Sequence, residues 1–291
     1  MGANSDHLNS LGGQIDGDIF GADGDDTITL NGTTFRGDIM GNSGADYFRI
    51  NSAEFIGSVQ GGTGNDTYVL FDEDIFIVEA AGEGTDLVIS YASRALNNNF
   101  ENLTLKGTRD IDGTGNDLDN VIAGNAGDNI LRGGQGIDTI SGGKGDDLLG
   151  GNAGNDILNG GNDNDILRGG LGADKLFGND GDDLIRAGSG NDKLYGGNGD
   201  DDMRGGTGKD DFIFKDGTEG IGQDIIRDFN AKNNAEDISL KGVAEITDFT
   251  DLKTNHMSQV GKNVVIDAGD GNSITLIDVD INHLHAADFI F

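Results

Sequence analysis

The chain has 291 residues and a net charge of −33, because 52 acidic residues outnumber 19 basic ones. This excess of negative charge disfavours nucleic acids and anionic membrane surfaces as partners and favours cations. The absence of cysteine excludes disulfides and thiolate metal sites, and no apolar run is long enough for a membrane span or a cleavable signal peptide. With 52 glycines and 35% hydrophobic residues, the chain needs something besides an apolar core to order it.

Residues 1–14 are expected to form an N-terminal tail, and residues 15–112 show a repeat with a period of 20. We interpret this period as one coil of a parallel β-helix with two short strands and two turns. One aspartate recurs in each repeat and is a candidate metal ligand: Asp26, Asp46, Asp66 and Asp86. Acidic turns without bound metal are the alternative for this section.

A stricter repeat fills residues 113–213, where eleven consecutive nine-residue blocks run from Gly115 to Ile213. Most blocks follow the pattern G-G-x-G-x-D-x-U-x, in which U is a large apolar residue. The eighth position is apolar in every block, from Ile122 to Phe212. We therefore expect one inward-facing apolar side chain from each block, which together form a core ladder.

The sixth position of each block supplies a candidate metal ligand. It is an amide in the first two blocks, Asn120 and Asn129, and a carboxylate in the other nine: Asp138, Asp147, Asp156, Asp165, Asp174, Asp183, Asp192, Asp201 and Asp210. Like charges stacked in a parallel sheet at ~4.8 Å repel one another, so a cation is expected between them. The repeats contain no Cys or His and have flexible glycine turns that present carbonyl oxygens, which favours calcium. An Asp/Gly turn array without metal is the alternative.

This pattern resembles the RTX nonapeptide repeat of calcium-binding proteins that Gram-negative type I secretion systems export. The resemblance implies an all-β, right-handed parallel β-helix/β-roll in which two blocks form one coil, x-U-x forms each strand and GGxGxD forms each turn. It also implies that calcium lies between the equivalent turns of alternate blocks, bound by the aspartates and by loop carbonyls. Candidate ligands on this basis include Gly133, Gly136, Gly142, Gly145, Gly151, Gly154, Gly169 and Gly172.

Steps of two blocks arrange the sixth positions in two columns, which begin at Asn120 and Asn129 and have nine gaps in all. The gaps next to these two asparagines have less negative charge, so we expect about seven strong calcium sites and a few more in residues 15–90. Several blocks depart from the pattern: Asp163 replaces the fourth glycine of one, Ala187 the first glycine of another, and Asn120 and Asn129 replace the aspartate of the first two.

Residues 214–291 lack the glycine repeat and are expected to form a β-rich C-terminal cap, since an open solenoid end exposes core and strand edge. Strand-like segments begin at Asp224, Glu236, Asn263 and Ser273, and a short helix is expected from Asp248. The segment also resembles the C-terminal flank of type I secreted proteases and lipases, which ends in an acidic residue followed by apolar ones, here residues 288–291. The resemblance implies a secretion region recognised by the type I apparatus during export.

The sequence contains neither H-E-x-x-H nor G-x-S-x-G, so we expect no zinc protease or lipase module and no catalytic site. The alternative is an enzyme of unknown type within residues 1–112. We expect a secreted, extracellular protein of a Gram-negative bacterium, with no transmembrane segment and no nucleic-acid partner, whose folding calcium drives after export.

Two roles remain open for the folded rod. One is a non-catalytic structural or adhesion protein at a cell surface. The other is a polysaccharide-binding accessory module that resembles the R-modules of alginate-modifying epimerases. A basic stripe would favour the second role, and the ninth position offers Arg132, Arg168, Arg186 and Arg204 in one two-block phase.

Overall fold

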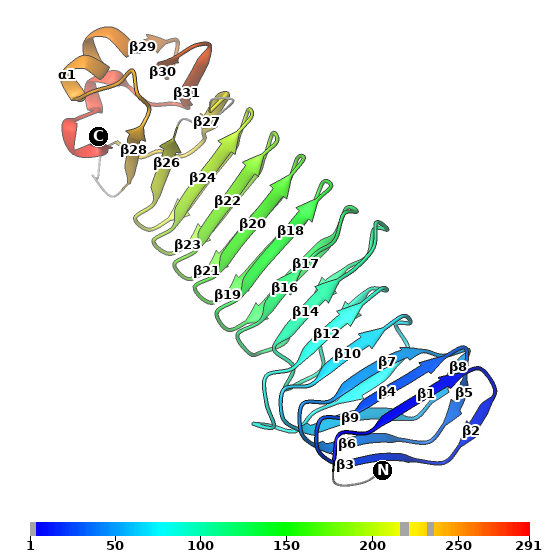
Figure 1. Ribbon diagram of the computed structural model, residues 1–291. Coiled ribbons are helices and arrows are strands. Elements are labelled where there is room, and N and C mark those ends of the chain that lie inside the picture. Colours follow the sequence, from blue (N-terminus) through cyan, green and yellow to red (C-terminus); the bar gives the residue numbers. More distant parts are fainter. Residues whose placement is uncertain (1–3, 216–220, 232–235) are drawn as a thin grey trace. The chain divides into compact units, whose positions relative to one another are not determined.

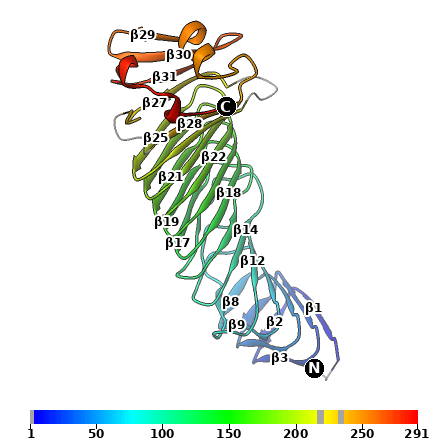
Figure 2. The ribbon, with the colours of Figure 1, turned by 90° about the vertical axis from the view of Figure 1, so that its left-hand side faces the viewer.

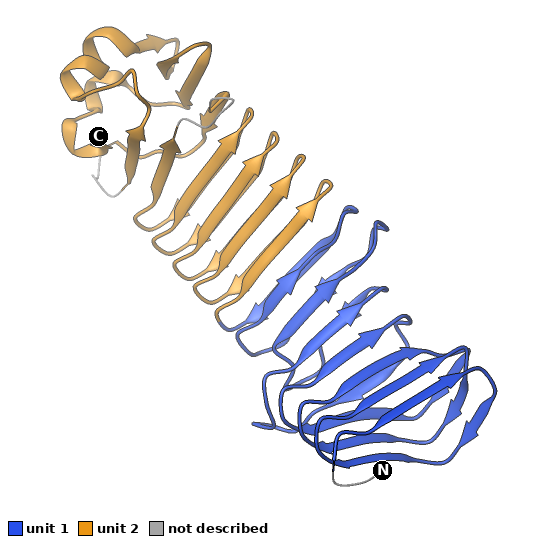
Figure 3. Cartoon of the chain, viewed as in Figure 1, with its two compact units in different colours: residues 1–136 blue, residues 137–291 orange. Residues whose placement is uncertain are grey.

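A computed structural model describes residues 4–215, 221–231 and 236–291. The chain divides into two compact units, residues 1–136 and 137–291 (Figure 3). In both units parallel strands stack coil upon coil, so the predicted all-β parallel solenoid is confirmed. The division lies inside the third nonapeptide block, and the first unit therefore contains all of the longer N-terminal coils and the first two blocks.

The longest sheet of the first unit receives one strand from each coil (Figure 1). Its parallel strands, in spatial order, are β1 (His7–Leu11), β4 (Thr27–Asn31), β7 (Tyr47–Asn51), β10 (Thr67–Leu70), β12 (Leu87–Ser90), β14 (Asn102–Leu105) and β16 (Val121–Ala123). Thr27 pairs with Tyr47, its equivalent in the next repeat. The solenoid begins within the segment that we expect to be a tail, because β1 pairs with β4; residues 1–3 of that segment lie outside the described residues.

Three coils of the period-20 region carry three strands each, so the expectation of two is wrong for them, whereas the coil that ends in β12 carries two. The two further sheets of these coils contain β3 (Ile19–Asp23), β6 (Ile39–Ser43), β9 (Ser58–Thr63) and β11 (Phe76–Val78), and β2 (Gln14–Asp16), β5 (Thr34–Arg36) and β8 (Glu54–Ile56). The extra corner lies at Gly17, Gly37 and Gly57, where φ is 118°, 151° and 141°. Glycine adopts these angles without a Cβ clash, and the chain turns there between two short strands. The unit also contains β13 (Arg94–Ala95), β15 (Gly113–Thr114) and β17 (Ile130–Gln135).

The second unit contains two stacks of parallel strands in which each coil consists of two nonapeptide blocks, as Ile140 pairing with Leu158 shows. One stack, prominent in Figure 1, consists of β18 (Thr139–Lys144), β20 (Ile157–Asn162), β22 (Lys175–Asp180), β24 (Lys193–Asn198), β26 (Asp211–Lys215), β28 (Asp237–Gly242) and β32 (Phe289–Ile290). The other, seen in Figure 2, begins with β19 (Leu148–Ala153), β21 (Ile166–Leu171), β23 (Leu184–Ser189), β25 (Asp202–Thr207) and β27 (Gln223–Ile226).

The strands of the nonapeptide region are longer than the x-U-x segment that the resemblance implies. Strands β18 to β25 continue through the first three positions of the next block. The second glycine of the block makes this continuation possible, since it lies within the strand at positive φ, for example 116° at Gly143 and 125° at Gly161. Only the fourth to sixth positions remain as a turn, and the sixth position ends that turn.

The apolar ladder of the nonapeptide blocks is confirmed. Ile122 and Leu131 in the first unit are at most 1% exposed. In the second unit every eighth-position side chain is fully buried: Ile140, Leu149, Leu158, Leu167, Leu176, Ile185, Leu194, Met203 and Phe212. This interior is only one side chain wide per strand, so the apolar core of each coil is small.

The C-terminal segment extends both stacks and then covers them. Next to β27 the sheet continues with β31 (Asn272–Leu276), β30 (Asn263–Gly269) and β29 (Met257–Val260). Strand β30 pairs antiparallel with both β31 and β29. The short helical elements are α1 (Phe249–Asp251), the π-helical turn η1 (Leu252–His256), and the 3-10 turns η2 (Ile281–His283) and η3 (Ala286–Asp288). No helix among the described residues is long and apolar enough to cross a membrane.

The fourth-position glycines provide a test of the coil spacing. A Cβ on Gly190, where φ is 142°, would lie 1.6 Å from the carbonyl oxygen of Gly172 in the preceding coil. We expect Gly190→Ala to destabilise the calcium-bound protein by more than about 1 kcal/mol. Gly150→Ala is the matched control, because its nearest neighbour, Asn152 Oδ1, is 3.9 Å away. Thermal unfolding in calcium measures both variants; equal melting temperatures would contradict this coil spacing.

Candidate metal centre

A ladder of buried aspartates follows the turns of the second unit. Each of the nine sixth-position aspartates is at most 2% exposed. Two columns result from the two-block coil, one from Asp138 to Asp210 and one from Asp147 to Asp201. Each aspartate comes directly before a strand, whose alternation places the sixth and eighth positions on the same inner side. The repeat therefore predicted the alignment of these residues correctly, but it did not predict their burial.

One carboxylate oxygen of each aspartate after the first in its column joins two successive coils. The backbone N–H of Asp165 donates to Oδ1 of Asp183 at 2.7 Å, and the same bond recurs along both columns at 2.7–3.0 Å. The second column has one more member, Asp224, whose Oδ1 accepts from the N–H of Asp201 at 2.9 Å. Asp224 is 1% exposed and is a site residue that the two-block phase missed.

The other carboxylate oxygen lacks a hydrogen-bond partner in the protein at seven of these positions. These oxygens are Oδ2 of Asp165, Asp174, Asp183, Asp192, Asp201, Asp210 and Asp224. A buried carboxylate oxygen without a hydrogen bond is strongly disfavoured, so its presence in a repeated pattern indicates a ligand that the protein itself does not supply.

The first glycine of most blocks lets that oxygen approach the backbone closely, where a Cβ would clash with it. The point where a Cβ of Gly178 would lie is 2.0 Å from Oδ2 of Asp183 and 2.5 Å from the carbonyl oxygen of Gly196 in the next coil. The same point beside Gly169 lies 2.4 Å from Oδ2 of Asp174 and 2.5 Å from the carbonyl oxygen of Ala187. We call this pair of a carboxylate oxygen and a carbonyl oxygen, which approach the same glycine, the oxygen cradle. Its donors are the oxygen ligands that calcium prefers.

The loop glycines that we expect to be ligands have two different positions in the turn. First-position glycines such as Gly142, Gly151 and Gly169 border the oxygen cradle, with the Cβ point 2.2–2.4 Å from the aspartate Oδ2. In the first unit, the carbonyl oxygen of Gly133 lies 2.3 Å from the corresponding point of Gly115. The fourth-position glycines begin the turn at positive φ: Gly136, Gly145, Gly154 and Gly172.

The two asparagines differ from the aspartates in how the protein satisfies them. Oδ1 of Asn120 accepts from the N–H of Asn116 at 2.7 Å, and its Nδ2 donates to the carbonyl oxygens of Phe100 and Glu101. Asn129 likewise accepts from Asn125 and donates to Ile111. Because protein groups use the amide oxygen and nitrogen, these coils hold together without an added cation.

The coils of the period-20 region reproduce the same arrangement. Asp26, Asp46, Asp66 and Asp86 are at most 2% exposed, and each Oδ1 accepts from the backbone N–H of the equivalent residue in the preceding coil at 2.6–2.8 Å. Oδ2 of Asp26, Asp46 and Asp66 has no hydrogen-bond partner in the protein. Glycines border oxygen cradles here too, for example Gly21, whose Cβ point is 2.2 Å from Asp26 Oδ2 and 2.6 Å from the Gly41 carbonyl oxygen.

Two glutamates that the sequence pattern missed complete this column. Oε2 of Glu101 accepts from the N–H of Asp86 at 2.8 Å, in the role that aspartates have elsewhere. Glu79 is 5% exposed and lies close to Asp66 and Asp86. Neither residue lies at a position that the 20-residue period predicts, so the period could not identify them. Asp224, by contrast, keeps the local order D-x-U of the repeat.

Burial raises the pKa values of the ladder aspartates. It raises the pKa of Asp165 to about 8 and those of Asp183 and Asp201 to about 7, and backbone N–H donors oppose this only in part. The carboxylate of Asp224 has its pKa raised to about 9 by burial, with a smaller contribution from the charge of Asp201. The ionised ladder therefore disfavours the folded state unless protons or cations offset its charge.

The proposed basic stripe is partly offset within the protein. Arg168, Arg186 and Arg204 stand side by side in register on β21, β23 and β25. Arg186 Nη1 lies 3.0 Å from Oδ1 of Asp202, which also pairs with Arg227, and Arg204 Nε lies 3.1 Å from Oδ2 of Asp228. Two carboxylates therefore face the three guanidinium groups of the stripe and that of Arg227, whereas Arg132 belongs to the first unit.

The family comparison agrees with this geometry. Residues 114–149, 145–176 and 177–212 match the RTX calcium-binding nonapeptide repeat, so the chain contains RTX calcium-binding repeats. No curated protein matches the chain. A solved structure that is similar is the extracellular lipase LipA from Serratia marcescens, with 17% identity and a TM-score of 0.37 over 72% of this chain. The match spans 45% of the lipase chain.

The raised pKa values predict how the calcium-free protein responds to pH. An aspartate whose folded pKa exceeds its unfolded value of 3.8 stabilises the folded state fully below about pH 3.8, and this stabilisation is lost as the pH rises through the folded pKa. For Asp165, Asp183 and Asp224 that loss extends to pH values of about 7 to 9. Circular dichroism in calcium-free buffer should therefore show more β signal near pH 4 than near pH 8.

The calcium-saturated protein serves as the control, since bound cations offset the same charges and should keep the roll folded at pH 8. A calcium-free protein with more β signal at pH 8 than at pH 4 would contradict the conclusion that burial raises the pKa values of these carboxylates.

Proposed function

We propose that calcium bound in the oxygen cradles of the turn ladder folds this chain outside the cell, and that the folded solenoid has a non-catalytic structural or adhesion role. The observation that carries the proposal is the row of seven buried Oδ2 atoms without a protein partner, most of them beside a first-position glycine. Oxygen donors alone, on flexible turns, suit calcium better than zinc or a soft metal.

The proposed ligands are the sixth-position aspartates, Asp224, and the carbonyl oxygens across each cradle. The two columns of the second unit, from Asp138 to Asp210 and from Asp147 to Asp224, have four gaps each. The count supports the expected total of about seven to nine ions in the nonapeptide array. The column from Asp26 to Asp86 supports a few more, because its carboxylates have the same contacts.

Calcium concentration would then select where the protein folds. Extracellular calcium modules bind with dissociation constants of about 10⁻⁴ to 10⁻³ M, so such sites stay empty in a cytosol with far less free calcium. Each site adds RT ln(1 + [L]/Kd), or about 1 kcal/mol at a concentration a few times above Kd. Several sites along one stack are sufficient to convert a chain with a narrow apolar core into a stable roll.

The structural or adhesion role has more support than the polysaccharide-binding role. Arg186 and Arg204 are paired with carboxylates of the protein itself. A surface that binds an acidic polysaccharide needs cations that remain available to the ligand. Export through a type I apparatus fits the RTX repeats and the C-terminal segment, in which β32 adds the final strand to one stack.

Calcium and magnesium should differ in their effect on the full-length chain. Magnesium requires near-octahedral geometry and retains its waters, whereas the cradles offer irregularly spaced oxygens. We expect the β signal in circular dichroism at neutral pH to appear on addition of millimolar calcium and not of equal magnesium. A complete β spectrum in the presence of chelator would contradict the proposal.

Replacement of one ladder residue tests the column arrangement. Asp165 contributes to two gaps, whereas Asn120 is uncharged and already hydrogen-bonded by the protein. Asp165→Ala should therefore raise the calcium midpoint of folding several-fold more than Asn120→Ala. Calcium titrations followed by circular dichroism compare the two variants; equal shifts would show that the columns do not bind calcium.

Removal of residues 232–291 tests the export route. We expect the truncated chain to remain inside a cell that carries the cognate type I transporter, whereas the full chain reaches the medium. Immunoblots of both fractions measure this distribution. Export of the truncated chain by the same transporter would place the secretion signal elsewhere.

A further inference from the structure

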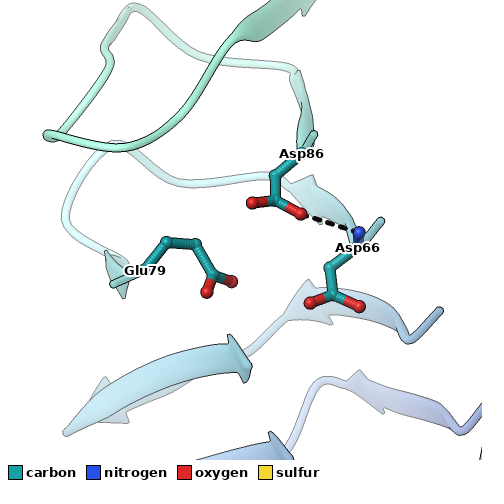
Figure 4. A group of neighbouring side chains, drawn as sticks. All are labelled: Asp66, Glu79 and Asp86. Carbon is teal, nitrogen blue, oxygen red and sulfur yellow. Dashed lines mark hydrogen bonds between the residues drawn. The ribbon is translucent and has the colours of Figure 1, made fainter. Parts of the chain in front are cut away.

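Three carboxylates meet in the first unit where one coil departs from the period of the repeat. Asp66 precedes β10, Asp86 precedes β12, and Glu79 directly follows β11 (Figure 4). Each offers one oxygen atom, and these three oxygens lie within 4.8 Å of one another. All three residues are buried, with exposures of 1%, 5% and 1% for Asp66, Glu79 and Asp86.

Glu79 occupies the position that a backbone carbonyl has in the two preceding coils. The Cβ points of Gly21 and Gly41 lie 2.6 and 2.5 Å from the carbonyl oxygens of Gly41 and Gly61. The Cβ point of Gly61 instead lies 2.5 Å from Oε1 of Glu79. A charged side-chain oxygen thus replaces a neutral carbonyl oxygen, and the cradle remains bounded by oxygen.

The carboxylate of Glu79 is held in place by the backbone and by one phenol. The N–H of Gly61 donates to Oε1 at 2.9 Å, and the N–H of Gly62 donates to Oε2 at 3.2 Å. The hydroxyl of Tyr68 donates to Oε1. Tyr68 is fully buried and stacks on Phe48, so its hydroxyl has a fixed position. This orientation leaves Glu79 directed at Gly61 and at the two aspartates.

A second, independent observation points to a ligand at this cluster. Oδ2 of Asp66 is buried without a hydrogen-bond partner, and it lies 2.1 Å from the same Cβ point of Gly61 that Glu79 approaches. Three carboxylates therefore meet where one buried oxygen, Oδ2 of Asp66, has no protein donor. Repulsion among them needs a cation to offset it.

We propose that Asp66, Glu79 and Asp86 form a calcium site of their own, distinct from the nonapeptide array. It lies outside the matched residues 114–212 and does not depend on the proposed array sites. Three carboxylates give it more negative charge than an array gap, which lies between two aspartates, and calcium affinity increases with ligand charge. The site fills at lower calcium concentration than the array and orders the irregular coil between β9 and β12.

Glu79→Gln in the full-length chain tests the ligand set by calcium equilibrium dialysis. The variant should lose the tightest bound ion, with an affinity at that site lower by about 10-fold or more. Glu73→Gln is the matched control, because Glu73 is an exposed glutamate just before β11 and its replacement removes the same charge. Equal ion numbers and affinities in the two variants would overturn the proposal.

Terbium luminescence provides a test that leaves the carboxylates intact. The chain has four tyrosines and no tryptophan, and Tyr68 contacts Glu79 directly. In full-length protein loaded with one equivalent of terbium, Tyr68→Phe should reduce tyrosine-sensitised emission by more than half. Tyr195→Phe, a substitution in β24, should not. Emission from Tyr68→Phe equal to that of the wild type would overturn the site.

Substitutions can disrupt the array sites and the site of Asp66, Glu79 and Asp86 separately. Asp165→Ala weakens the array and leaves the Tyr68-sensitised emission unchanged, whereas Glu79→Gln removes this emission and leaves calcium-induced folding of the second unit in place. A loss of Tyr68-sensitised emission in Asp165→Ala would contradict an independent site.

Discussion

The burial of like-charged carboxylates in register is the constraint on which the structure depends. Each aspartate of the ladder except the last in each column donates its backbone N–H to the carboxylate of the next coil, so the coils cannot stack without bringing the charges together. Backbone hydrogen bonds and burial change the pKa values of these carboxylates in opposite directions, and the effect of burial is larger. The backbone bonds lower the pKa of Asp165, yet burial outweighs them and raises it to about 8. The folded roll therefore requires a partner for its charge, either protons or cations.

A narrow core makes this dependence strong. One apolar side chain per strand fills the interior, from Ile140 to Phe212 in the second unit, and each coil contacts only its neighbours. In such a linear array, stability is approximately a sum of repeat and interface contributions. Binding at one interface then stabilises the two coils that form it, and order spreads along the stack. The cap contributes differently, since β30 and β31 pair antiparallel and bury apolar residues without a carboxylate ladder.

The parts of the structure that repeat were predictable from the sequence, and the parts that interrupt the repeat were not. The nine-residue phase identified the buried aspartates and the apolar ladder, because an identical backbone conformation recurs in each block. Glu79 could not be predicted in this way, because its side chain reaches a cradle from the residue after β11, which does not lie at a repeat position. The third strand of three coils in the period-20 region depends on the corner at Gly17 and its equivalents, whose φ no periodicity reveals. Asp224 follows an insertion that breaks the two-block phase after Asp201.

The most direct test of the central claim is a structure from crystals grown in calcium, with anomalous diffraction measured at a long wavelength at which calcium scatters anomalously. The account predicts anomalous peaks between successive coils, within calcium–oxygen distance, about 2.3–2.6 Å, of aspartate Oδ2 and of the carbonyl oxygen across each cradle. Beside Gly178, the expected ligands are Asp183 and the carbonyl of Gly196. Peaks confined to exposed acidic residues, or a folded ladder without any peak, would contradict it.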